Sequence, residues 1–181
     1  MDPTYEQPGI NAMYMEIPLG ERTMLDAIMT LDSTFKMNTK MVQLKTGIKS
    51  FDMTFNVAHQ YHLIPDAKMR NISGNVYFGG YSFVGQLWEF GLWGETLSSL
   101  NIDGNFGEVV FGIDHTFDNG FYLMCEYFHN SLGAKEDSLN FGHYMNYYDG
   151  KLHSLMQNYI YSMGMYRFTG FVSGSMLAFG N

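Results

Sequence analysis

Residues 107–127 read GEVVFGIDHTFDNGFYLMCEY, and the fold prediction starts from this stretch. Most odd positions on both sides of Asp118–Gly120 are apolar or aromatic, whereas polar and small residues are common at the even positions. A period of two is typical of β-strands that have one apolar face. Gly120 suits the left-handed position of a three-residue hairpin turn. Because an odd loop length keeps both apolar sets on one side, the stretch predicts an antiparallel hairpin.

The same alternation continues through most of the chain. In residues 39–48 the apolar positions are even, and in residues 51–63 they are odd. Lys49 and Ser50 provide the even loop length that joins such strands with their apolar sides together. We predict ten strands, over residues 9–18, 22–31, 39–48, 51–63, 70–86, 90–98, 106–117, 121–130, 153–167 and 170–180.

Short and long connections alternate strictly between the predicted strands. Short turns are expected at residues 18–21, 49–50, 87–89, 118–120 and 168–170. Longer loops are expected at residues 32–38, 64–69, 99–105 and 131–152. Up-and-down strands would place all short turns at one end of the sheet, which is the arrangement of outer-membrane barrels. The sequence therefore predicts an all-β fold, an antiparallel up-and-down transmembrane β-barrel that occupies residues 1–181 as one domain.

The composition agrees with a strand-rich protein. The chain carries 10 Lys and Arg against 18 Asp and Glu, so its formal net charge is −8. Charged residues make up 15% and aromatic residues 17%, which excludes a disordered chain. The lack of a basic cluster argues against nucleic acid as a partner. The single cysteine, Cys125, excludes a disulfide framework and a cysteine-based zinc site.

The alternation assigns different surroundings to the two sides of each strand, because successive side chains point to opposite faces. The polar side is expected to line a wet lumen, and its predicted members are Glu95, Glu108, Asp114, Glu126, Lys45, Asn56 and Gln60. The apolar side is expected to face lipid, and its predicted members are Phe55, Val57, Val109, Phe111, Ile113, Leu123 and Tyr127.

Few residues indicate reaction chemistry. His59 and His62 fall on opposite sides of one strand, so they cannot bind one metal ion together. In the predicted hairpin Glu126 is the diagonal neighbour of Asp114, roughly 7–8 Å away. Paired carboxylates occur in glycosidases, but two solvated groups in a lumen are favoured here. We expect no enzymatic activity, no metal site and no cofactor.

The loop predicted at residues 131–152 is rich in Tyr and Asn and is the longest connection. Long loops in compact folds are often functional. We expect it at the outer end of the barrel, where it either folds inward as a constriction or stays outside as a surface for a partner.

Five segments carry a resemblance to a known group of proteins. They are YEQPGINA at 5–12, IPLG at 17–20, GLWGE at 91–95, FGIDHTFDNGFY at 111–122 and EYFHNSLG at 126–133. They resemble a family of poorly characterised porin-like β-barrel proteins of the gram-negative outer membrane. The resemblance implies contact with a lipid bilayer, passage of small polar solutes, and insertion by the barrel-assembly machinery.

A second class of protein shares the alternating pattern. A soluble lipocalin-like β-barrel would bind an apolar ligand inside and cover its outside with charged residues. The predicted polar sides carry few charges and the apolar sides carry large aromatic residues, which favours lipid contact.

The predicted turns also indicate an incomplete barrel. If the short turns are periplasmic, the strands at 9–18 and 170–180 place both chain ends at the outer side. The family resemblance implies that complete barrels keep both termini in the periplasm. We therefore expect an open sheet with free first and last strands, belonging to a parent barrel of about twelve strands or more.

Overall fold

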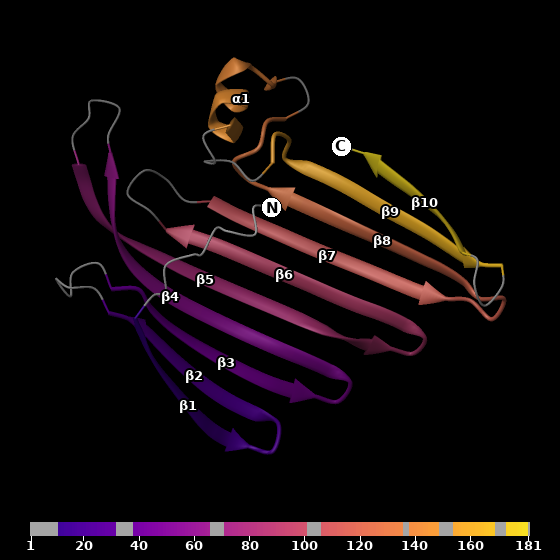
Figure 1. The fold of residues 1–181 in the computed structure, drawn as a ribbon, viewed down its shortest axis with the longest axis horizontal. Coiled ribbons are helices and arrows are strands. Elements are labelled where there is room, and N and C mark those ends of the chain that lie inside the picture. Colours follow the sequence, from indigo (N-terminus) through magenta and orange to yellow (C-terminus); the bar gives the residue numbers. More distant parts are fainter. Residues whose placement is uncertain are drawn as a thin grey trace, which may run out of the picture.

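The computed structural model describes residues 11–31, 38–65, 71–100, 106–135, 138–148, 154–168 and 173–180. These residues form one antiparallel sheet of ten strands, in which neighbours in the sequence are neighbours in the sheet (Figure 1). The strands are β1 (Ala12–Gly20), β2 (Thr23–Thr30), β3 (Lys40–Ile48), β4 (Phe51–Pro65), β5 (Asn71–Leu87), β6 (Phe90–Leu100), β7 (Phe106–Thr116), β8 (Phe121–Asn130), β9 (Asn158–Arg167) and β10 (Ser173–Gly180). The predicted all-β, antiparallel up-and-down arrangement of ten strands is confirmed.

The sheet is open. Within the described ranges β1 pairs with β2 and β10 pairs with β9, so each of these two strands has one unpaired edge. We expected such free first and last strands from the positions of the turns. Pro18 lies on the edge strand β1 beside a shift in register, where a missing backbone N–H is tolerated.

The turns after β1, β3, β5 and β7 lie together at one end of the sheet, and α1 (Phe141–Tyr148) lies at the other end (Figure 1). Ile48 pairs with Phe51 and Leu87 pairs with Phe90, so each of these hairpins has a two-residue turn. The first residues of the two turns, Lys49 and Trp88, both have a φ of 55°. Primed hairpin turns require a positive φ at this position.

The hairpin of β7 and β8 has the predicted three-residue turn. Gly120 has a φ of 80°, and its N–H donates to the Phe117 carbonyl oxygen over 2.8 Å. The Phe117 N–H in turn donates to the Phe121 carbonyl oxygen over 2.8 Å. Asp114 lies opposite Met124, as the predicted register requires.

The structure corrects the start of strand nine. We predicted a strand from residue 153, but β9 begins at Asn158. The backbone of residues 154–157 pairs with the loop that follows β8 instead: the Gln157 N–H donates to the Ala134 carbonyl oxygen over 2.9 Å, and the Ala134 N–H donates to the Leu155 carbonyl oxygen over 2.8 Å. Residues 154–156 therefore do not extend the ladder with β8, whereas Gln157 still contacts its last residue, because the Asn130 N–H donates to the Gln157 carbonyl oxygen over 2.7 Å.

The predicted long loop is also partly helical, because it contains α1. The Asn140 side chain caps this helix by accepting the N–H of Gly142 over 2.9 Å, a common role of Asn before a first helical turn. No helix in the described part of the chain is long and apolar enough to cross a membrane.

Several predicted boundaries fall outside the described residues. They are the strand residues 9–10, 70, 153 and 170–172, and the loop residues 32–37, 66–69, 101–105, 136–137 and 149–152.

Replacing Gly120 by alanine tests the turn. We expect Gly120→Ala to lower the free energy of unfolding by roughly 1–2 kcal/mol, because an L-residue is strained at positive φ. Gly79→Ala is the matched control, since a Cβ atom at either glycine meets no atom within 4 Å and Gly79 has no positive φ. Urea unfolding of the two variants in detergent measures the difference. Equal losses would contradict the turn conformation.

Candidate functional site

The cross-strand pairs define two faces of the sheet, because residues directly opposite each other project to the same side. We call the face with Glu126 the inner face and the face with Ile113 the outer face. In the middle of β7 and β8 the inner-face residues are buried or half-buried, whereas most outer-face residues are exposed. This difference indicates that the sheet curls around the inner face.

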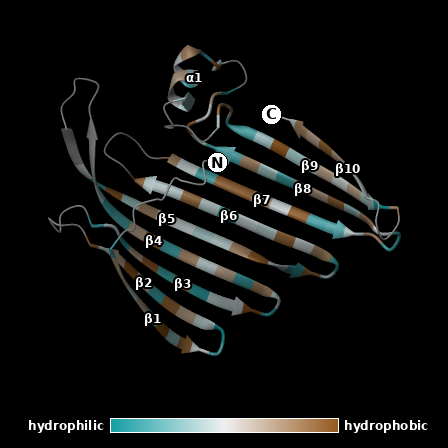
Figure 2. Ribbon diagram, in the orientation of Figure 1, coloured by the Kyte–Doolittle hydropathy of each residue, from teal (hydrophilic) through white to brown (hydrophobic). Residues whose placement is uncertain are grey.

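All predicted polar-side residues lie on the inner face. They are Lys45, Asn56, Gln60, Glu95, Glu108, Asp114 and Glu126. All predicted apolar-side residues lie on the outer face. They are Phe55, Val57, Val109, Phe111, Ile113, Leu123 and Tyr127. Hydrophobic and hydrophilic positions accordingly alternate along the strands (Figure 2).

The charges are distributed very unequally between the faces. Among the Asp, Glu, Lys and Arg residues of the described strands, Lys40, the first residue of β3, is the one that lies on the outer face. One row of the inner face crosses eight strands and consists of Glu16, Asp26, Gln43, Asn56, Gly80, Leu97, Glu108 and Asn130. The inner face is thus polar and mainly acidic.

Asp26 is the centre of a polar cluster on β1, β2 and β3. Its side chain is buried, and its Oδ2 lies 2.7 Å from the Lys45 ammonium. The Tyr14 hydroxyl lies 3.1 Å from Asp26 Oδ1 and 2.7 Å from Glu16 Oε2. On the same face the Gln43 amide donates to Asn56 Oδ1 over 2.6 Å. Both oxygens of the buried Asp26 carboxylate thereby have a partner, as burial of a charged group requires.

Trp93 connects three strands on the inner face. Gly112 on β7 lies opposite both Trp93 on β6 and Glu126 on β8. The Trp93 Nε1–H donates to Glu126 Oε2 over 3.0 Å. A Cβ atom on Gly112 would overlap the indole ring. Glycine at this position therefore provides the space through which the indole reaches the carboxylate.

Asp114 and Glu126 bind different partners. Asp114 Oδ2 accepts the Tyr122 hydroxyl over 3.0 Å, whereas Glu126 accepts the Trp93 indole. The two carboxylates therefore do not form a hydrogen-bonded pair of the kind that shares a proton. The described residues contain no group of three or more His, Cys, Asp or Glu side chains placed to hold a metal ion.

The predicted histidines contribute little to the inner face. His59 lies on the outer face, where its Nε2 is 3.0 Å from Asn75 Oδ1. The His62 side chain lies outside the described part of the structure. Cys125 is exposed on the outer face, with its Sγ 3.5 Å from the Ser162 hydroxyl.

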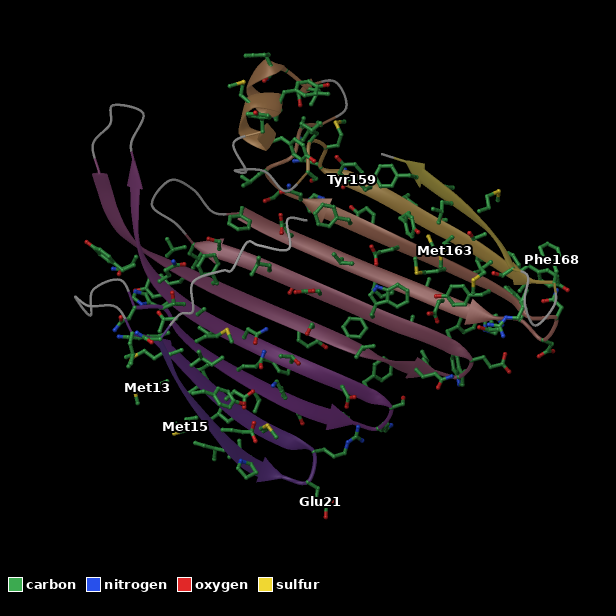
Figure 3. The ribbon with its side chains drawn as sticks, in the orientation of Figure 1. Met13, Met15, Glu21, Tyr159, Met163 and Phe168 are labelled. Atoms are coloured by element: carbon green, nitrogen blue, oxygen red, sulfur yellow. The ribbon has the colours of Figure 1, made fainter. Side chains whose placement is uncertain are left out.

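A cavity of about 350 Å³ opens on the inner face below α1, and we call it the α1 cavity. Its main walls are Glu126 and Phe128 of β8, Tyr159 and Tyr161 of β9, Phe179 of β10 and Tyr147 of α1. Tyr159 lies at the end of β9 nearest to α1 (Figure 3). The aromatic ring centroids are 6.1 Å apart between Phe128 and Tyr159, and 5.2 Å apart between Tyr159 and Phe179.

Sequence reasoning identified Glu126 but not the aromatic residues of the α1 cavity. The Tyr-rich composition of the predicted loop pointed to a ligand contact, and Tyr147 comes from that loop. Phe128, Tyr161 and Phe179 lie on the same face of the sheet because of the pairing of β8, β9 and β10. That pairing depends on where β9 begins, which the alternation alone misplaced.

The chain matches no protein-family model, no curated protein and no solved structure.

The fluorescence of Trp93 tests its bridge to Glu126. In a Trp88→Phe background Trp93 is the single tryptophan of the chain. We expect Gly112→Ala to displace the indole, shift its emission to longer wavelength, and lower the free energy of unfolding by roughly 1–3 kcal/mol through overpacking.

Gly107→Ala is the control on the same strand, because a Cβ atom there meets its nearest neighbour at an ordinary 3.7 Å. The emission spectrum of this control should stay unchanged. If Gly112→Ala left the emission of Trp93 unchanged as well, the position of the indole over Gly112 would be wrong.

Proposed function

We propose that this chain forms a porin-like β-barrel, or part of one, in the bacterial outer membrane. In this proposal small polar solutes diffuse passively along the inner face, and the protein does not act as an enzyme. The observation that carries the proposal is the division between a polar, charged inner face and an apolar outer face. Membership of the porin-like family and insertion by the barrel-assembly machinery are parts of the same proposal.

The outer face supports contact with lipid. Val57 is 64% exposed, Phe111 45% and Phe55 44%, and many other large apolar side chains are exposed beside them. Contiguous apolar surface of this kind is rare on soluble monomers. An outer-membrane barrel instead requires an apolar band around its outside.

The inner face supports a water-filled passage. Its carboxylates include Asp26, Glu95, Glu108, Asp114 and Glu126. Its basic side chains in the described strands are Lys45, which pairs with Asp26, and Arg167. Charges that line a pore set the local concentration of ions. The excess of carboxylates favours the entry of cations over anions.

The unpaired edges of β1 and β10 would need hydrogen-bond partners if the sheet lay in a membrane. Backbone N–H and C=O groups that face lipid must be hydrogen-bonded, because hydrocarbon offers no partner. The free edges of β1 and β10 therefore need strands to pair with in a bilayer. We propose that they pair within a barrel of more than ten strands.

An arginine on each face separates the membrane proposal from a soluble lipocalin-like barrel. We expect Ile113→Arg to cost roughly 2–4 kcal/mol of unfolding free energy in lipid, because the charge enters the apolar band. In water the same change would cost little, since Ile113 is already exposed.

Ser82→Arg is the control for the inner face. Ser82 lies opposite Glu95 and borders a cavity of about 210 Å³, so an arginine there has both space and a partner. Unfolding by urea from lipid vesicles measures both variants. Equal costs for Ile113→Arg and Ser82→Arg would overturn the assignment of the faces.

Conductance of the full chain in a planar lipid bilayer tests the passage itself. We expect discrete current steps and, in a KCl gradient, a reversal potential that indicates preference for K⁺ over Cl⁻. Protease protection in vesicles verifies insertion independently. Inserted protein without current steps would rule out a pore.

A further inference from the structure

We propose that the α1 cavity binds a small organic cation of the quaternary ammonium type, with Glu126 as the counter-charge and aromatic rings as the walls. Such a bound state goes beyond passive diffusion. It requires neither pore activity nor a bilayer, so its test can fail or succeed independently of the conductance experiment.

The walls present aromatic rings from three adjacent strands. Phe128, Tyr159 and Phe179 follow one another across β8, β9 and β10, with interplanar angles of 36° and 37° between successive rings. Tyr147 contributes a further ring from α1. Ring faces attract cations through their quadrupole, and cages of several rings are the usual way to bind quaternary ammonium groups.

The charge that the described residues bring to the α1 cavity is negative. Glu126 is the sole Asp, Glu, Lys, Arg or His among the described wall residues. Its Oε2 accepts one hydrogen bond from the neutral Trp93 indole, and within the described part of the chain it has no ion-pair partner. A carboxylate accepts several further contacts. A cation therefore complements this cavity, whereas an anion would be repelled.

Two hydroxyl groups around the α1 cavity already form hydrogen bonds within the protein. The Tyr159 hydroxyl accepts the Met156 N–H over 2.9 Å. The Ser154 hydroxyl donates to the Met156 carbonyl oxygen over 3.1 Å and accepts from the Asn130 amide over 3.1 Å. A sugar would need many free polar partners. A quaternary ammonium group has no N–H or O–H to donate, so it does not need such partners.

The segments after β8 and before β9, which lie beside the α1 cavity, are packed against each other before any ligand binds. Asn130 is 1% exposed, and its Oδ1 accepts the Leu132 N–H over 2.9 Å. Ala134 and Met156 are buried where their segments form a parallel bridge. This packing fixes the position of Tyr159, and a preformed site loses less entropy on binding. A volume of about 350 Å³ suits a small molecule.

Calorimetric titration of the full chain with choline tests the proposal. A polyoxyethylene detergent is suitable, because it carries neither a choline nor a sugar headgroup. The neutral isostere 3,3-dimethylbutan-1-ol has the shape of choline without its charge. We expect saturable binding of choline and binding of the isostere that is weaker by about tenfold or more.

Variants of the chain identify the site. Glu126→Gln keeps an acceptor for the Trp93 indole but removes the charge, and we expect it to weaken choline binding about tenfold. Phe179→Leu should weaken it too, because one ring of the wall is lost. Glu95→Gln is the matched control, since it removes the same charge on the same face outside the α1 cavity and should leave the affinity unchanged.

Three results would overturn the proposal. They are equal affinities for choline and its isostere, unchanged choline affinity in Glu126→Gln, and glucose binding more tightly than choline. Circular dichroism verifies that each variant keeps its strands. Where Phe179→Leu fails this check, Tyr147→Leu replaces it, because Tyr147 lies on α1 outside the sheet.

Discussion

The register of antiparallel pairing is the constraint on which the other features of this structure depend. Side chains alternate along every strand, so a shift of one residue would move all side chains of that strand to the other face. Nine successive pairings keep the same division from β1 to β10. Turns of fixed length at Lys49–Ser50, Trp88–Glu89 and Asp118–Gly120 maintain that register. A polar inner face and an apolar outer face follow directly.

Large side chains that lie over small neighbours give each face its own kind of contact. On the outer face the ring of Phe83 covers Gly94, an apolar contact between adjacent strands. On the inner face the indole of Trp93 covers Gly112 and ends in a hydrogen bond to Glu126. Glycine without a side chain permits both approaches, and an aromatic ring covers the backbone that glycine leaves bare. The contact of Trp93 with Gly112 differs from that of Phe83 with Gly94, because the indole also donates a hydrogen bond to the Glu126 carboxylate.

Glu126 links the proposed pore to the proposed ligand site. It belongs to the acidic inner face, and it is also the charged wall of the α1 cavity. Solutes that move along the inner face would pass this cavity at the end of the sheet where α1 lies (Figure 1). Cations that the carboxylates concentrate would therefore reach aromatic walls able to hold one of them.

The alternation and the loop lengths predicted the ten strands, the two faces and the turns at Lys49–Ser50 and Asp118–Gly120. Period-two alternation follows from local backbone geometry, and loop parity relates one strand to the next, so Gly120 and the inner position of Glu126 were predictable. The start of β9, the helix α1 and the aromatic walls were decided by the tertiary structure. They depend on contacts such as Asn130 with Ser154 and Ala134 with Met156, between segments more than twenty residues apart. No local period encodes such contacts, because they form only when two distant segments meet at one end of the sheet.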